Sequence, residues 1–283
     1  MVMMFKILVL QRLYNLSDDQ TEYQINDRMS FMRFLGINLC EKVPDAKTIW
    51  KFKNDLAETK TVNTLFCMFD EYLEKEGLIS HKGTIVDATF VDAPRQRNSR
   101  DENKKIKNGE IPEEWEKPEN KIKLAQKDID ADWTKKNGER HFGYKDHVKC
   151  DADSKLITNY SVTSASVHDS QRCLVFIGQE DEVLYADSAY SGKPIALALP
   201  ENCKNQICEK GYRNSPLTSE QKMNNRRKSR IRCRIEHIFG FMTGAMHGIT
   251  IRSIGITRAW MNIGITNLVY NFCRYSYLKR ASA

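Results

Sequence analysis

From residue 1 to about residue 78 the apolar side chains recur at helical spacing. Positions three or four apart share one helix face, as do Phe5, Leu8, Val9 and Leu13, and later Phe31, Phe34 and Leu35. Ser17, followed by two aspartates, has the chemistry of a helix N-cap. Gly36 is expected to end the helix that holds Phe34. This pattern predicts an all-helical N-terminal domain over residues 1–80.

Two further helices are expected in this region, over residues 43–56 and 61–76. The first turns its apolar residues inward and points Lys47, Lys51 and Lys53 outward. A turn followed by a basic helix is typical of a helix-turn-helix DNA reader, which would place Lys47, Thr48 and Lys51 near DNA. A packed helix with lysines on its solvated face explains the pattern equally well.

The alternation changes at residues 83–91, GTIVDATFV, which have the β-branched and aromatic character of a strand. The run is apolar enough for a strand that is buried on both faces, yet it contains Asp87. An ionised carboxylate in such a strand costs several kcal/mol unless a cation meets it. We therefore expect Asp87 to hold a metal ion.

A second apolar run, residues 183–186, delivers Asp187 at its C-terminal end, and a third acid, Glu236, lies in the helical run 229–242. Two acids at strand ends and one on a helix would repel one another without a cation. Hard divalent ions with oxygen ligands suit such a pocket, which favours Mg²⁺, with Mn²⁺ as a substitute.

Between the acids the chain predicts a mixed α/β sheet. Strands are expected over residues 142–150 and 156–163, joined by the turn 151–154, then a helix over 170–178 that crosses to the strand of Asp187. A short strand is expected near residues 203–209. A capping box at Thr218 opens one helix that runs to Phe239, and a final helix over residues 257–278 packs on the sheet.

Residues 93–141 interrupt this pattern, because they are highly charged, poor in apolar residues and rich in Pro and Gly. Such a segment is too long for an ordinary connection. We interpret it as an insertion, as a substrate-contacting loop or as a partly disordered segment. Arg95 and Arg97, directly after the strand of Asp87, are placed to contact phosphate.

Composition indicates a cytoplasmic protein with no membrane segment. The 283 residues are 41% hydrophobic, enough for a proper core. The apolar stretch 4–10 is far shorter than the roughly 20 residues that a membrane helix needs. The eight cysteines are scattered without a CxxC or zinc spacing, which indicates reduced thiols. A Cys203–Cys208 pair is a minor alternative.

The formal net charge of +7 is unevenly distributed. Residues 222–234 carry seven basic side chains and no acid: Lys222, Arg226, Arg227, Lys228, Arg230, Arg232 and Arg234. A basic stripe beside an acidic metal pocket indicates a polyanionic substrate such as nucleic acid. A solvated helix face would explain only some of these charges.

Several segments together resemble a known family. The runs KTIWKFKNDL, DADWTKKNGERHFGYKDHVKCD, VTSASVHDSQ, YADSAYSG and RIEHIFGFM occur in this order along almost the whole chain. They resemble a bacterial DDE transposase of the insertion-sequence-five family. The strand order is also that of an RNase H-like core, so the expected fold is an RNase H-like mixed sheet with flanking helices over residues 81–283, preceded by the helical domain.

The resemblance implies that Asp87, Asp187 and Glu236 are the catalytic acids and metal ligands, and that Arg232 contacts a phosphate. It implies DNA as partner, namely the terminal inverted repeats and the target, and a homodimer on DNA in the nucleoid. Met242 and Thr243 stand where the family often has a basic residue. The helical region also starts late, so we expect part of the end-recognition domain to be missing.

Three other functions are alternatives to this interpretation. A nuclease of the same fold would use the same acids, and a decayed or recruited transposase would only bind DNA. The presence of all three acids argues against the second of these. The neighbours His168, Asp169 and Ser170 invite a hydrolase-triad reading, which we reject because adjacent residues rarely converge as a triad does.

Overall fold

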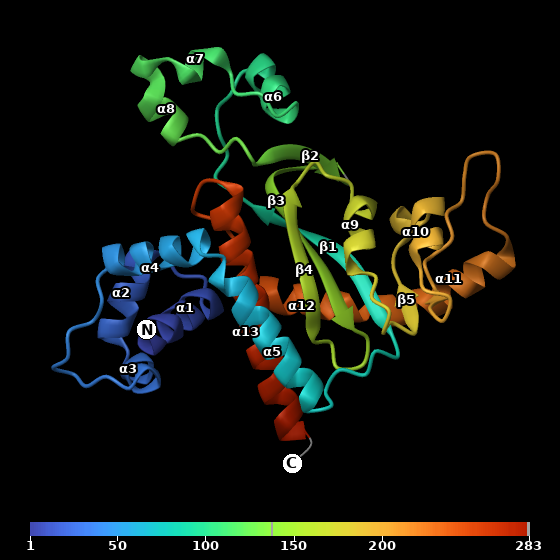
Figure 1. The fold of residues 1–283 in the computed structure, drawn as a ribbon, viewed down its shortest axis with the longest axis horizontal. Helices are drawn as coiled ribbons and strands as arrows, with labels where there is room; N and C mark the ends of the chain where they lie inside the picture. Colours follow the sequence, from blue (N-terminus) through green and yellow to red (C-terminus); the bar gives the residue numbers. More distant parts are fainter. Residues whose placement is uncertain (137, 282–283) are drawn as a thin grey trace.

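The computed structural model describes residues 1–136 and 138–281 and shows five N-terminal helices followed by a six-stranded mixed sheet with helices around it (Figure 1). The N-terminal helices confirm the predicted pattern. Their bounds are α1 Val2–Leu13, α2 Asp18–Asp27, α3 Met29–Leu35, α4 Ala46–Glu58 and α5 Thr61–Lys75.

Local capping explains where these helices begin and end. Ser17 and Gln20 form a capping box at the start of α2, each side chain accepting a hydrogen bond from the other residue's backbone N–H. Gly36 ends α3 with a φ of 78°, in the left-handed region that favours glycine. The Asp45 side chain accepts a hydrogen bond from the Thr48 N–H and caps α4.

One expectation for α4 is wrong. Lys53 does not point into solvent, because it forms an ion pair with Asp18 of α2 and is largely covered. Lys47 and Lys51 are exposed, as predicted.

The sheet is built around β3, the longest strand. Its six strands are β1 Thr84–Asp92, β2 Asp132–Lys136, β3 Glu139–Asp151, β4 Ile157–Ser164, β5 Val183–Tyr185 and β6 Lys204–Asn205. β3 pairs antiparallel with β1 along one edge, and with β2 and then β4 along the other. β1 pairs in parallel with β5, and β5 with β6. The expected hairpin and crossover are thus present, whereas β2 was not predicted.

The C-terminal helix α13, Ile256–Ala281, ties the two regions together. It packs on β4 and also on α1, α4 and α5, and α13 and α5 lie side by side in Figure 1. The Asn271 side chain bonds to both the backbone N–H and the C=O of Ile157 in β4. A single hydrophobic cluster includes Ile7 and Ile49 from the N-terminal helices and Val148 from the sheet.

The insertion is organised rather than disordered. It forms α6 Arg100–Lys107, α7 Glu113–Glu116, the short turn η1 Pro118–Asn120 and α8 Lys121–Ala125, which project from one end of the sheet (Figure 1). Trp115 is fully buried at its centre, and its indole N–H donates to Glu102. One buried tryptophan thus forms the centre of the insertion, although the sequence of this segment is highly charged.

The remaining helices lie after β4. They are α9 Ser170–Phe176, the turn η2 Ser188–Tyr190, α10 Lys193–Ala198, α11 Ser219–Arg232 and α12 Arg234–Thr243. The predicted single helix from Thr218 to Phe239 is therefore two helices, with the break at Cys233. Thr218 and Gln221 form the predicted capping box.

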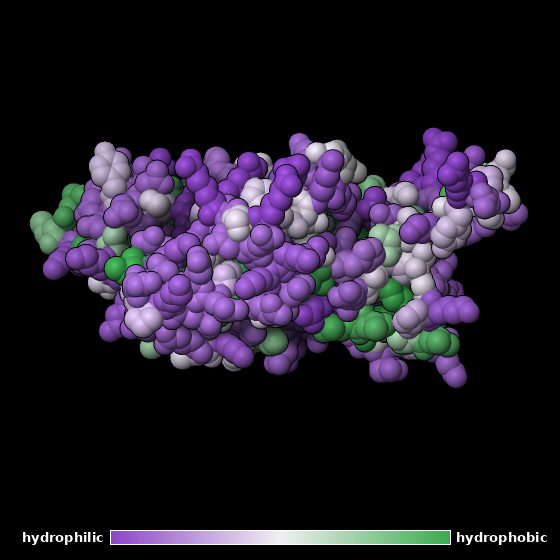
Figure 2. All heavy atoms as spheres, turned by 90° about the horizontal axis from the view of Figure 1, so that it is seen from above, coloured by the Kyte–Doolittle hydropathy of each residue, from purple (hydrophilic) through white to green (hydrophobic). Residues whose placement is uncertain are grey.

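The surface is mostly hydrophilic in the view of Figure 2, with hydrophobic residues gathered toward one end. Exposed apolar side chains at α9 and α10 include Val175 and Leu197. The eight cysteines are free thiols. Within the described residues, the helices are all too short or too polar to cross a membrane.

Candidate active site

Asp87 and Asp187 reach the same edge of the sheet because β1 and β5 run in parallel. Thr84 pairs with Leu184 and Ile85 with Tyr185. The pairing offset is 184 − 84 = 100, so the same register, continued by two residues, places Asp187 beside Asp87. The parallel pairing of two short apolar strands thus positions two carboxylates that are far apart in the sequence.

Each aspartate is oriented by a local backbone hydrogen bond. The Asp87 side chain, 15% exposed, accepts from the N–H of Ala88 at 2.8 Å. Asp187 is exposed, stands at the start of η2 and accepts from the N–H of Ser188 at 2.5 Å. Ala186, directly before it, is fully buried. Because the residue before it is buried and Asp187 itself is exposed, the Asp187 carboxylate lies at the surface, just beyond the C-terminal end of β5.

Glu236 arrives from the other side, in the first turn of α12. Ile235 and Ile238 are fully buried and fix this helix against the sheet. The Glu236 side chain is 56% exposed and faces Arg232, four residues earlier across the helix break. The sequence therefore presents the acid on the outer side of a helix that is anchored by its apolar neighbours.

Arg232 links these acids electrostatically. Its Nη1 lies 2.9 Å from Asp87 Oδ2 and 3.4 Å from Glu236 Oε1. Burial lowers the pKa of Arg232, but the nearby carboxylates of Asp87, Asp187 and Glu236 outweigh that effect and raise it. Burial raises the pKa of Asp87 to about 6, and the Glu236 charge adds to this, although the Ala88 N–H and Arg232 oppose it.

The three acids line one pocket of about 380 Å³. Its other polar lining residues are Thr89, Lys136, Glu139, His141 and Arg232. Carboxylate oxygens are the donors that hard divalent cations prefer. The donor set and the raised pKa of Asp87 both fit a cation at this position, because positive charge would relieve the repulsion among the acids.

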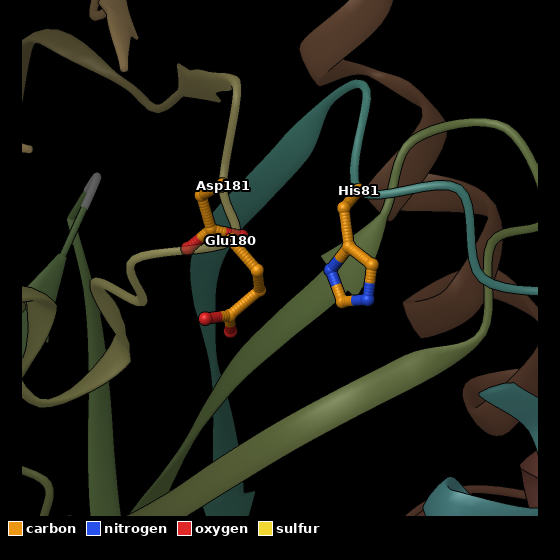
Figure 3. A group of neighbouring side chains, drawn as sticks. All are labelled: His81, Glu180 and Asp181. Atoms are coloured by element: carbon orange, nitrogen blue, oxygen red, sulfur yellow. The ribbon is translucent and has the colours of Figure 1, made fainter. Parts of the chain in front are cut away.

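Another group has closer ligand geometry but a different partner. Among the described residues, one ligand atom each from His81, Glu180 and Asp181 lie within 4.8 Å of one another, in loops before β1 and β5 (Figure 3). Lys149 Nζ lies 2.9 Å from Asp181 and 3.5 Å from Glu180. Thr84 also donates to Asp181. Lys149 pairs with both acids and offsets part of their charge, so the three residues form an ion-pair cluster. In the part of the chain that the structure describes, Asp87, Asp187 and Glu236 do not form a group within 4.8 Å of one another. Arg232 contacts two of these acids, Asp87 and Glu236.

The predicted basic residues divide into free and engaged side chains. Arg226, Arg227 and Arg230 are exposed on α11, as are Arg95 and Arg97 near the insertion. Lys228 donates to the Ile207 carbonyl at 3.0 Å and lies near Glu209. Arg234 donates to the Ala152 carbonyl and to Asp153. Lys228 and Arg234 thus hold α11 and α12 to the loops that follow β6 and β3.

The geometry also bears on the rejected hydrolase triad. His168 Nδ1 and Ser170 Oγ are 2.8 Å apart. Asp169, however, forms an ion pair with Lys145 at 2.8 Å. The lining residues of the pocket of the three acids do not include His168, Asp169 or Ser170.

Lys136, Glu139 and His141 also line the pocket. They lie in the segment DADWTKKNGERHFGYKDHVKCD that carries the family resemblance, but no role in the site was assigned to them from the sequence. They come from the β2–β3 hairpin, whose first strand was not predicted. The sequence signal for β2 is weak, because this strand has five residues and none of them is buried.

Two family models match the chain. One, described as a transposase DDE domain, covers residues 79–272. The chain belongs to the DDE transposase family. A second model, described as a transposase domain, matches residues 1–55, which include the first three helices. No solved structure matches the chain.

The two matched regions of this DDE transposase correspond to the two structural regions of the chain. The matched DDE region contains Asp87, Asp187 and Glu236 together with the sheet and α13 as far as residue 272. The second region carries α4 only in part, since it ends at residue 55. The two matches fall on either side of α5 and agree with a helical region before the sheet.

Proposed function

We propose that the protein is an insertion-sequence transposase of the insertion-sequence-five family, with an RNase H-like core that hydrolyses phosphodiester bonds at transposon ends and joins them to target DNA. The observation that carries this proposal is the pocket where acids from β1, the end of β5 and α12 meet Arg232. We propose Asp87, Asp187 and Glu236 as its catalytic acids.

These acids would hold divalent metal, Mg²⁺ or Mn²⁺ as substitute. Two such ions, when bound, activate a water or 3′-hydroxyl and stabilise the leaving oxygen during in-line attack on phosphorus. The chain's own part is to fix the acids: parallel pairing aligns Asp87 with Asp187, and buried isoleucines in α12 hold Glu236. Arg232, already between two carboxylates, would turn one N–H edge of its guanidinium to the scissile phosphate.

The basic surface would bind the phosphate backbone without reading sequence. Arg226, Arg227 and Arg230 present three free cations on α11, on the same chain segment that leads to Glu236. Lys47 and Lys51 of α4 would contact DNA from the helical region. We further propose action as a homodimer on DNA in the bacterial cytoplasm and nucleoid.

The test uses the DNA that flanks the gene. Labelled fragments that carry its terminal inverted repeats are incubated with the purified protein and Mg²⁺ or EDTA, with a supercoiled plasmid as target. The proposal expects cleavage at the repeat end and a joined product, both only with metal. Cleavage without joining would indicate a nuclease of the same fold. Binding without cleavage would indicate a protein that only binds DNA.

A further inference from the structure

Two hollows extend from the catalytic pocket along the β2–β3 hairpin. The nearer one, about 500 Å³, shares Glu139 and His141 with the catalytic pocket. The farther one, about 540 Å³, shares Trp133 and Arg140 with the nearer one. The shared residues show that the three hollows adjoin one another around the hairpin, with Arg140 and its neighbour His141 on opposite faces of β3. We call the outer two hollows the insertion groove.

The groove has cations on both walls. Arg100, Lys104 and Lys107 stand at i, i+4 and i+7 of α6, so they form one stripe on the side that faces β2. Opposite them, Lys135 of β2 pairs directly with Arg140 of β3. Like charges in such a cross-strand pair are destabilising. In the whole groove, six basic side chains face three acidic ones.

The cations of the groove have no acidic partners within the molecule. Across the described residues, no ion pair involves Arg100, Lys104, Lys107, Lys135 or Arg140. The insertion does form ion pairs elsewhere, as between Lys105 and Glu113. The groove therefore carries a surplus of unpaired positive charge, whereas neighbouring charges in the insertion are paired. Such a surface would attract an external polyanion.

The floor of the groove is aromatic. Trp133, shared by both hollows, is half-buried and packs on Phe142 with ring centroids 5.1 Å apart. Toward the catalytic pocket, His141 stacks on Phe90 at 4.2 Å and 6°. The guanidinium of Arg95, an exposed residue, lies 5.9 Å from the Trp133 ring. Cations interleaved with aromatic rings suit unpaired nucleotides, whose base faces are free to stack.

We propose that the insertion groove binds a single-stranded segment of DNA that continues from the phosphodiester in the catalytic pocket. Backbone phosphates would contact the α6 stripe and the Lys135–Arg140 pair, and a base would stack on Trp133. The direction of the strand rests on the proposed function of the catalytic pocket. The capacity to bind an unpaired strand rests on the groove alone.

Binding is tested without metal, so that it does not depend on catalysis. Fluorescein-labelled (dT)15 and a 15-base-pair duplex are titrated in EDTA with the wild type, R100A/K104A and the control K117A/K121A. The control removes two exposed lysines from the insertion outside the groove. We expect R100A/K104A to bind (dT)15 about tenfold more weakly, with a salt slope smaller by about 1.4, since each contact with a single strand contributes about 0.7. The control should bind like the wild type.

Tryptophan fluorescence reports the stacking. The chain has four tryptophans. Trp133→Phe should remove most of the decrease in tryptophan fluorescence that (dT)15 causes, while the phenylalanine keeps an aromatic ring packed at this position. Equal (dT)15 affinity in R100A/K104A and the control, or unchanged quenching in Trp133→Phe, would overturn the groove. If the wild type then still cleaves and joins transposon ends, the proposed function stands without it. If the groove variants weaken (dT)15 binding but the wild type never cleaves DNA, the proposed function fails instead.

Discussion

Arg232 Nη1 donates a hydrogen bond to Asp87 Oδ2 at 2.9 Å, joining two residues that are 145 positions apart in the chain. The same atom lies 3.4 Å from Glu236. In the protein without DNA, this guanidinium supplies the positive charge that the acidic pocket needs. On the proposed function, it would compete with a divalent ion before DNA binds, and it would become available to a phosphate once the ion is in place.

Arg232→Ala should separate these two roles. Removing the competing cation should leave Mn²⁺ affinity in the absence of DNA equal or higher. Cleavage should fall roughly 10- to 150-fold, because a hydrogen bond to a charged group is worth about 1.5–3 kcal/mol. Calorimetric titration with Mn²⁺ and single-turnover cleavage measure the two effects.

Arg232→Lys is the matched control, since it keeps the charge but loses the planar fork. It should recover metal affinity close to the wild type and only part of the cleavage rate. If Arg232→Ala loses metal binding, the residue supports the acids structurally and does not compete with the metal.

The exposed arginines of α11 should govern non-specific DNA binding. In R226A/R227A, we expect weaker binding to any duplex and a salt slope smaller by about 1.8, since each phosphate contact contributes about 0.9 for B-DNA. Fluorescence anisotropy from 50 to 200 mM salt measures this slope.

Lys228→Ala gives the contrast on the same helix. Lys228 holds the Ile207 carbonyl and lies near Glu209, so its loss should lower the free energy of unfolding by about 1 kcal/mol and leave the salt slope unchanged. A larger change of slope in Lys228→Ala than in R226A/R227A would argue against DNA contact through the exposed arginines.

Asp146 and Asn267 form a fully buried pair whose proton count can be tested. Asn267 Nδ2 donates to Asp146 Oδ1 at 3.2 Å, while Asp146 Oδ2 and Asn267 Oδ1 are buried acceptors without a partner. Burial raises the pKa of Asp146 well above its usual value. A proton on Asp146 would supply a donor where these two acceptors have none.

The pKa of Asp146 is higher in the folded protein than in the unfolded chain. The protonated carboxyl therefore contributes its full stabilisation below the unfolded-state pKa, and this stabilisation is lost as the pH rises through the folded-state pKa. Asp146→Asn replaces the proton by an amide N–H and does not titrate. Relative to the wild type, the variant should gain stability with rising pH, by about 1–3 kcal/mol at pH 8.

Urea unfolding at pH 5 and pH 8 measures this difference. Asp55→Asn, on the exposed face of α4, should differ from the wild type by less than about 0.5 kcal/mol at either pH. A stability loss in Asp146→Asn that is the same at both pH values would show that the wild-type carboxylate is ionised.

Much of the fold could be predicted because its signals are local. Helix caps at Ser17 and Thr218 and the stop at Gly36 depend on residues a few positions apart. The convergence of Asp87 and Asp187 on one pocket could be anticipated as well, since two short apolar runs, one containing an acid and one delivering an acid at its C-terminal end, favour parallel neighbours in a sheet.

The rest depends on contacts that are distant in sequence. Strand β2 has no buried residue, and its pairing with β3 decides its existence. The order in the insertion comes from Trp115, one apolar residue among many charges. Likewise, Lys228 and Arg234 have the same chemistry as their exposed neighbours, and only tertiary partners at Ile207 and Ala152 distinguish them.

The central claim is that three acids from separate elements act together on one phosphodiester. The most direct measurement is the rate of Mg²⁺-dependent cleavage of the labelled transposon end by Asp87→Asn, Asp187→Asn and Glu236→Gln. The surface variant Glu182→Gln, whose acid precedes β5 and is exposed, serves as control. We predict a loss of roughly 10³-fold or more in each of the three, because metal ligation contributes several kcal/mol, with DNA binding at least as tight as in the wild type and a normal rate in the control. A wild-type rate in any one of the three would contradict the account.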